Sequence, residues 1–230
     1  MFVGLGGFCT SGRIDRDLEL NKFALPFDFI RSKFYGVNEL IKNDFLEFLP
    51  EKGTSPDDIW GEGGELTIYF RNTHTFYHHN LLDNNIYEAF NRRINRFINL
   101  LNKEKEIIFY RVITSQFISD EINLRENFYN TLKIKYSNLN FKIIFIGFVK
   151  NNTPIENVYY KKLDETACIF YITVNNNSDH ITPYSASCIK FFIQNGLLDK
   201  KIQININDFT YEDFDFEEKT QNEIFLDNYV

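Results

Sequence analysis

Short apolar runs alternate with amphipathic segments along most of the chain. Four of these runs are apolar at nearly every position and have the length of a buried strand: residues 2–5, 106–113, 141–149 and 166–174. Two further strands are expected at residues 66–70 and 201–206. Strands that are apolar on both faces are typical of the middle of a parallel sheet, where helices cover both sides.

Between these runs the apolar residues recur at helical spacing. The clearest case is residues 86–102, where one stripe of a helix would carry Ile86, Phe90, Ile94, Phe97 and Leu101. Helices are also expected over residues 10–20, 34–49, 119–136 and 184–198. Buried strands that alternate with helices of this length need crossover connections. The pattern therefore predicts an α/β fold with a mainly parallel sheet, flanked by helices in a three-layer, Rossmann-like arrangement.

The composition suits one folded domain with an unusual C-terminal segment. The chain has 230 residues, 43% of them hydrophobic, which is enough to bury a large core. We expect a single α/β domain over residues 1–206. Residues 207–230 carry eight carboxylates against one lysine, with aromatic residues among them. A purely solvated tail would lack these aromatic residues, so we expect this segment to pack on the body or on a partner.

Charge and cysteine usage narrow the classes of partner. A net charge of −7 argues against a nucleic-acid partner, because such proteins present basic faces. The three cysteines have no paired or zinc-binding spacing, which indicates a reducing, cytoplasmic setting and no metal. No apolar run is long enough to span a membrane, and the N-terminus does not resemble a signal peptide. The glycines at positions 4, 6 and 7 fall short of a dinucleotide fingerprint, so no cofactor is expected.

Cys9 is the main candidate for chemistry. It follows the turn Gly6-Gly7 and precedes a helix that Thr10 or Ser11 would begin. A thiol at a helix N-terminus faces aligned amide dipoles, which favour the reactive thiolate. The glycine turn lets backbone N–H groups approach an oxyanion in the substrate. The competing interpretation is a small buried hydrophobe, the commonest role of a free cysteine. We assign Cys168 and Cys188 to that role, because each lies in an apolar segment.

A thiol nucleophile needs a base, and the chain has four histidines. Three of them, His74, His78 and His79, fall within six residues, and we expect the base to come from this cluster. The fourth, His180, follows Asp179 in a loop after the 166–174 strand and is a further candidate base. Asp179 is then expected to hold the substrate or to orient this histidine.

Two charged residues are expected to complete the site. Asp28, in the segment Pro26-Phe27-Asp28-Phe29, has the chemistry to orient a histidine or a substrate hydroxyl. Arg111 lies near the end of the 106–113 strand and has the chemistry to bind an anionic group. If the 2–5 and 106–113 strands are parallel neighbours, Cys9, Asp28 and Arg111 meet at one sheet edge, where α/β proteins bind ligands. Arg92, Arg93 and Arg96 are weaker candidates for an anion site.

Four stretches, taken in order, resemble a bacterial and viral family of putative papain-like cysteine peptidases. They are Leu5-Gly6-Gly7-Phe8-Cys9, Pro26-Phe27-Asp28-Phe29, Phe90-Asn91-Arg92-Arg93-Ile94-Asn95-Arg96-Phe97 and Ile108-Phe109-Tyr110-Arg111. The chain departs from the family pattern at Phe29, where tryptophan is usual, and at Phe90, where tyrosine is usual. The family histidine aligns with either His78 or His79. The resemblance covers the first half of the chain and implies cysteine catalysis.

Three functions remain open on this evidence. The first is a cysteine-dependent hydrolase or acyl-transfer enzyme that acts on a small-molecule, peptide or glycan substrate, with Cys9 as nucleophile. The second is a glycan-biosynthesis enzyme, a glycosyltransferase or sugar-modifying protein, that holds a phosphorylated donor near Arg111 and uses Cys9 structurally. The third is a non-catalytic binding domain. A hydrogen bond between Cys9 and a histidine would favour the first.

Overall fold

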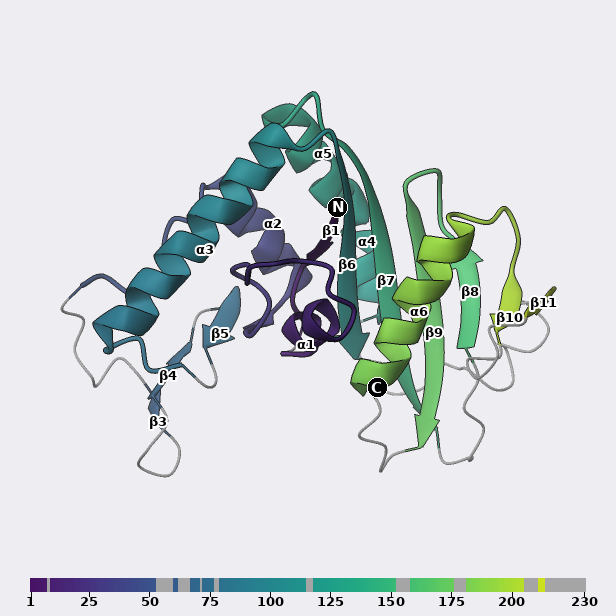
Figure 1. The fold of residues 1–230 in the computed structure, drawn as a ribbon, viewed down its shortest axis with the longest axis horizontal. Helices are drawn as coiled ribbons and strands as arrows, with labels where there is room; N and C mark the ends of the chain where they lie inside the picture. The colour runs from purple at the N-terminus through teal and green to yellow at the C-terminus, as the bar shows by residue number, and fades with distance from the viewer. Residues whose placement is uncertain are drawn as a thin grey trace. The chain divides into compact units, whose positions relative to one another are not determined.

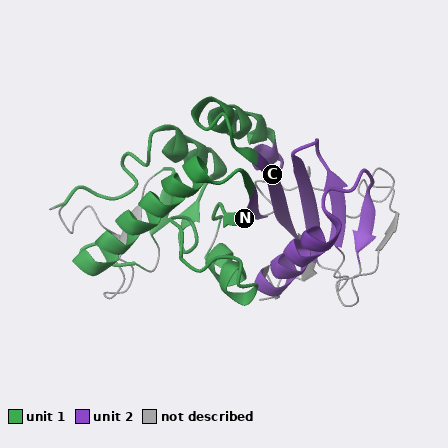
Figure 2. Ribbon diagram, turned by 45° about the horizontal axis from the view of Figure 1, so that its top comes forward, with its two compact units in different colours: residues 1–107, 123–140 green, residues 108–122, 141–230 purple. Residues whose placement is uncertain are grey.

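The fold of the chain is given by a computed structural model (Figure 1). It describes residues 1–7, 9–52, 60–61, 67–70, 72–76, 79–114, 118–151, 158–175, 181–204 and 211–213. The chain divides into two compact units, one of residues 1–107 and 123–140 and the other of residues 108–122 and 141–230 (Figure 2). The expectation of one domain over residues 1–206 stays a prediction. Most of the C-terminal segment 207–230 lies outside the described residues.

Unit 1 is mainly helical and carries a small antiparallel sheet of strand order β2-β5-β4-β3. Its elements are β1 (Phe2–Gly4), α1 (Thr10–Asp17), β2 (Arg31–Ser32), α2 (Phe34–Lys42), β3 (Trp60–Gly61), β4 (Thr67–Phe70), β5 (His74–Phe76), α3 (Asn84–Lys103) and α5 (Arg125–Lys135). The short strands β2 and β5 have too few residues to show an alternating pattern, and the sequence did not predict them.

Packed phenylalanine rings form the core of unit 1. Phe27 lies at its centre, with ring centroids 5.5 Å from Phe45, 6.1 Å from Phe48 and 5.5 Å from Phe97. Most of these rings meet edge to face, which is the favourable geometry for aromatic pairs. Phe27 belongs to the segment that also holds Asp28, so this core fixes the backbone next to the candidate site.

Helix α3 forms where its apolar stripe predicts it. The helix begins after Asp83, whose carboxylate accepts a hydrogen bond of 2.8 Å from the backbone N–H of Asn85. Phe90, Phe97 and Leu101 from the predicted stripe are buried. The predicted bounds, 86–102, agree with the observed helix to within two residues at each end.

Helix α2 is shorter than predicted, because it ends at Lys42 rather than near residue 49. Asp44, Phe45 and Glu47 have φ angles of 53°, 61° and 61°, which no right-handed helix allows. These left-handed residues turn the chain back so that Phe45 and Phe48 enter the aromatic core. The helical spacing of Phe45 and Phe48 therefore reflects their burial in the core and not a continuing helix. The predicted helix at 119–136 is likewise divided, into α4 (Ile118–Asn123) and α5.

Unit 2 contains a sheet with the strand order β6-β7-β9-β8-β10-β11. Its strands are β6 (Glu106–Thr114), β7 (Asn140–Asn151), β8 (Val158–Lys162), β9 (Ala167–Asn175), β10 (Ile202–Ile204) and β11 (Tyr211–Asp213). Strands β7 and β9 pair in parallel from Ile143 and Ala167 to Asn151 and Asn175. Strand β8 pairs antiparallel with both β9 and β10, and β10 with β11.

Helices cover the two faces of this sheet. Figure 1 shows α6 (Ile181–Asn195) in front of the strands and α4 behind them. Helix α4 approaches β7 at Gly147, where an added Cβ would lie 2.7 Å from the Cδ1 atom of Ile118. The prediction of a three-layer α/β fold is therefore confirmed, with parallel pairing at the centre of the sheet and antiparallel pairing at one edge.

The packing of α2 in unit 1 yields a test of the fold. A Cβ atom at Gly36 would collide with the backbone carbonyl of Thr73, which cannot move as a side-chain tip can. We expect Gly36→Ala to lower the free energy of unfolding by about 1–3 kcal/mol, despite the higher helix propensity of alanine. Urea denaturation measures the change, and Glu39→Ala on the same helix is the control. A Gly36→Ala variant as stable as the wild type would contradict this packing.

Candidate active site

Cys9 lies at the start of α1, as the sequence predicted, but it occupies the N-cap position that the sequence assigned to Thr10 or Ser11. Its side chain is partly exposed, whereas Cys168 and Cys188 are buried. The thiol donates a hydrogen bond to the backbone carbonyl of Phe29, with an Sγ–O distance of 3.6 Å. The first backbone N–H groups of a helix have no partner within the helix and carry a partial positive charge. Cys9 thus combines access to solvent with a position at the N-terminus of a helix.

The turn before Cys9 depends on its glycines. Gly6 and Gly7 have φ angles of 73° and 99°, a region that other residues rarely adopt. A side chain at Gly6 would also collide with the hydroxyl of Ser32. The backbone N–H of Gly7, proposed from sequence as an oxyanion donor, donates to Ser32 Oγ at 3.2 Å. In this structure Ser32 therefore holds the amide that the sequence assigned to the substrate.

Helix α1 rests directly on the segment that contains Asp28. The backbone N–H of Gly12 donates to the carbonyl of Asp28 at 2.8 Å, and the hydroxyl of Ser11 donates to the carbonyl of Phe27 at 3.5 Å. A Cβ atom at Gly12 would lie 2.5 Å from the ring of Phe29. Glycine is therefore needed here for the close approach. These contacts bring Cys9 and Asp28 to one region of unit 1.

Asp28 is a buried carboxyl group, with only 1% of its surface exposed. Its Oδ2 atom accepts a hydrogen bond of 2.5 Å from the N–H of Leu25, and its Oδ1 atom has no hydrogen-bond partner. Burial, followed by the negative charge of Asp15, raises the pKa of Asp28 well above its usual value. The Leu25 hydrogen bond and the charge of Arg93 oppose this shift only in part. Asp28 thus holds its proton over a wider pH range than an ordinary aspartate.

Arg93, on α3, is the cation whose charge partly lowers the pKa of this carboxyl group. Its guanidinium lies 5.7 Å from the ring centroid of Phe29 and 4.4 Å from that of Phe90. The Nη1 atom of Arg93 is buried without a hydrogen-bond partner. A carboxyl oxygen of Asp28 and a guanidinium nitrogen of Arg93 are therefore both buried without a hydrogen-bond partner, which is uncommon in folded proteins. The apolar stripe predicted over residues 86–102 placed Arg93 off the buried face of the helix but gave no sign that its charge acts on Asp28.

The histidines occupy different environments. His79 packs its ring against Phe90, with centroids 5.0 Å apart, and Phe90 in turn lies against Arg93. His74 is a core residue: its Nε2 atom bonds the carbonyl of Phe48, its Nδ1 atom bonds Thr73 Oγ1, both at 2.8 Å, and its ring stacks on Phe48. The candidates His78 and His180, with Asp179, lie outside the described residues.

Arg111 belongs to unit 2, where it forms a buried ion pair. It is 1% exposed, and its Nε and Nη2 atoms donate to the two carboxylate oxygens of Glu121 at 2.7 Å and 2.5 Å. This two-pronged pairing neutralises the guanidinium. The expectation that Arg111 binds an anionic substrate group beside Cys9 and Asp28 stays untested. Among the described residues, no group of three or more His, Cys, Asp or Glu side chains is placed to hold a metal ion.

The three cysteines should differ in their reaction with iodoacetamide. Burial raises the pKa of both Cys168 and Cys188, so each is protonated as well as inaccessible in the folded state. We expect Cys9 to be alkylated first near neutral pH, and the other two only after unfolding. Mass spectrometry of peptides taken over time measures the order. Equal labelling of all three thiols in the folded protein would contradict the burial pattern.

The raised pKa of Asp28 predicts how stability depends on pH. Between the unfolded value, near 4, and the higher folded value, the folded protein holds a proton that the unfolded chain releases. This contribution to stability is complete below pH 4 and is lost as pH rises toward the folded pKa. Relative to the wild type, Asp28→Asn should therefore gain up to about 1.4 kcal/mol per pH unit in this window. Denaturant titrations at several pH values test this, and parallel curves for the two proteins would contradict it.

Comparison with known proteins places the chain in a family. No curated protein and no solved structure matches it. Among the described residues, no helix has the length and apolar character needed to cross a membrane. A family model matches residues 1–151, which include Cys9, Asp28, His79 and Arg93. Because this match spans more than half of the chain, the protein belongs to the DUF1796 family, described as putative papain-like cysteine peptidases.

Proposed function

We propose that this protein is a cysteine-dependent hydrolase or acyl-transfer enzyme with Cys9 as its nucleophile. The observation that carries the proposal is the position of Cys9, a partly exposed thiol at the N-terminus of α1 in a chain whose other two thiols are buried. Membership of a family described as cysteine peptidases supports the same chemistry. The substrate class is a peptide, ester or glycan-linked acyl group.

The proposed reaction has two steps. The Cys9 thiol gives its proton to a histidine, and the thiolate attacks the acyl carbon of the substrate. The N–H groups at the start of α1 stabilise the oxyanion, and the leaving group departs with the proton from the histidine. Water, or another acceptor, then attacks the thioester and releases the acyl group, with the same histidine accepting and returning the proton.

We propose His79 as this histidine. Its ring is held by Phe90, which also contacts the Arg93 guanidinium, and Arg93 packs on Phe29, the residue whose carbonyl accepts the Cys9 thiol. His79 is therefore linked to Cys9 through packed side chains of unit 1. Proton transfer would require the Cys9 thiol to leave the Phe29 carbonyl and come within hydrogen-bond distance of the His79 ring. His78 and His180 are the competing bases, and the experiment below distinguishes all three.

Asp28 and Arg93 have supporting roles in this proposal. Asp28 positions α1 through its carbonyl, which accepts from Gly12, and it braces the preceding turn through Leu25. Arg93 supplies positive charge near the segment that contacts the thiol. The alternative of a glycan-biosynthesis enzyme required a cation at Arg111 for a phosphorylated donor. The pairing of Arg111 with Glu121 argues against that assignment.

Hydrolysis of activated esters and fluorogenic peptides tests the proposal. Cys9→Ala should abolish turnover and the acyl-enzyme mass seen with the wild type, while Cys188→Ala should retain both. Substitution of the base by glutamine should lower turnover by about 10²- to 10⁴-fold. We expect this effect in His79→Gln and not in His78→Gln or His180→Gln.

A second measurement needs no substrate. The alkylation rate of Cys9 is measured as a function of pH in the wild type and in the three histidine variants. The variant that lacks the base should show an altered pH dependence, and we expect this change in His79→Gln alone. Full activity in Cys9→Ala would overturn the nucleophile assignment and favour a non-catalytic or different enzymatic role. An unchanged pH profile in His79→Gln, with a change in one of the other two variants, would reassign the base.

A further inference from the structure

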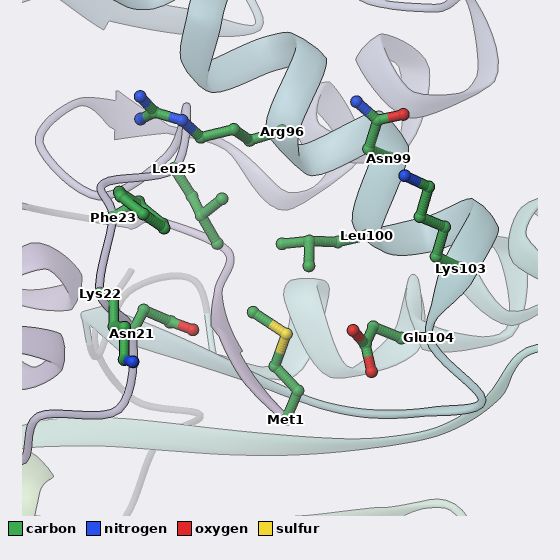
Figure 3. A pocket seen from close by; sticks show the side chains of 10 residues that line it. All are labelled: Met1, Asn21, Lys22, Phe23, Leu25, Arg96, Asn99, Leu100, Lys103 and Glu104. Carbon is green, nitrogen blue, oxygen red and sulfur yellow. The ribbon is translucent and has the colours of Figure 1, made fainter.

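A separate pocket of about 290 Å³ lies in unit 1, between the segment 21–25 and the C-terminal half of α3 (Figure 3). Leu25 and Leu100 point into it in Figure 3, and Phe23, which is 64% exposed, lies at one side. Its volume is at the lower end of the range for small-molecule sites, about 300–1,000 Å³. The pocket therefore suits one compact ligand with an apolar part.

The charges around this pocket are opposite to the charge of the protein. Lys22, Arg96 and Lys103 line it, against the single carboxylate of Glu104, although the chain as a whole carries −7. In the part of the chain that the structure describes, none of these three cations forms an ion pair with a carboxylate. Elsewhere in unit 1, Lys52 and Lys135 do so, with Glu88 and Asp44. Unpaired cations around a concave site favour an anionic ligand.

Arg96 is held in place without being neutralised. Its Nη1 atom donates to the carbonyl of Ala24 at 3.3 Å, and its guanidinium lies 5.1 Å from the ring centroid of Phe23. These contacts orient the planar group and leave other N–H donors for a ligand. A guanidinium forms two-pronged, charge-assisted hydrogen bonds with a phosphate, and a lysine ammonium adds a point charge. The exposed face of Phe23 supplies a surface on which a planar group can stack.

We propose that this pocket binds a small phosphorylated molecule with a planar body, of which a mononucleotide is the simplest example. The Arg96 guanidinium holds the phosphate, Lys22 and Lys103 add positive charge around the pocket, and Phe23, Leu25 and Leu100 contact the body. The inference goes beyond the proposed hydrolase activity and does not depend on Cys9, which does not line the pocket.

Calorimetric titration of the full chain with the four ribonucleoside monophosphates tests the proposal. We expect at least one to bind at least about ten-fold more tightly than its nucleoside, which lacks the charged phosphate, and than inorganic phosphate, which lacks the body that contacts Phe23, Leu25 and Leu100. The affinity should fall as salt is added. Binding of the nucleoside as tightly as the nucleotide would overturn the anion site. Absence of binding by all four at millimolar concentration would overturn the proposal.

Variants connect the binding to these residues. Lys22→Gln and Lys103→Gln should each lower the affinity for the nucleotide by at least about ten-fold. The melting temperature should stay unchanged, since neither ammonium has a structural hydrogen bond. Arg96→Gln should lower this affinity further. Arg92→Gln is the matched control, because Arg92 is exposed on the same helix outside the pocket. Cys9→Ser should bind as the wild type does. Equal loss in Arg92→Gln, or no loss in Lys22→Gln and Lys103→Gln, would overturn the assignment.

Discussion

The candidate site depends on the close approach of α1 to the segment 27–29. That approach requires a residue without a side chain at Gly12, because a Cβ atom there would overlap the ring of Phe29. It is fixed by the hydrogen bond from Gly12 to the carbonyl of Asp28 and by the burial of Phe27 in the aromatic core. Cys9 is one turn earlier on the same helix, so its position is set by the core of unit 1 and not by a mobile surface.

Burial separates the roles of the three cysteines and of the two described histidines. The thiols of Cys168 and Cys188 and the ring of His74 are enclosed by apolar neighbours, and both ring nitrogens of His74 have partners. Such residues contribute to stability and are poor candidates for proton transfer or attack. Among the residues that the structure describes, Cys9 and His79 therefore remain the candidates for the proposed nucleophile and base.

Elements with a long, regular pattern could be predicted from the sequence. Helix α3 and strands β7 and β9 follow their apolar patterns closely, and the start of α1 follows from the glycine turn before Cys9. The end of α2 could not be predicted, because Phe45 keeps helical spacing while its backbone is left-handed. Strand β8 was missed because its run ends in two lysines. The partner of Arg111 was also hidden, since its pairing with Glu121 depends on how α4 packs on the sheet.

The charge of Asp28 bears on the proposed chemistry. The sequence alone suggests an ionised carboxylate, whereas the structure favours the neutral acid. An ionised aspartate beside a cysteine opposes thiolate formation, because like charges repel. Asp28 is instead buried, and its raised pKa favours the neutral acid. Its neighbour Phe29 accepts the hydrogen bond of Cys9, and the Arg93 guanidinium lies against the Phe29 ring. Asp28 therefore places less negative charge beside Cys9 than an ionised aspartate would, and the burial that keeps it neutral makes it unsuitable as an anionic partner for histidine.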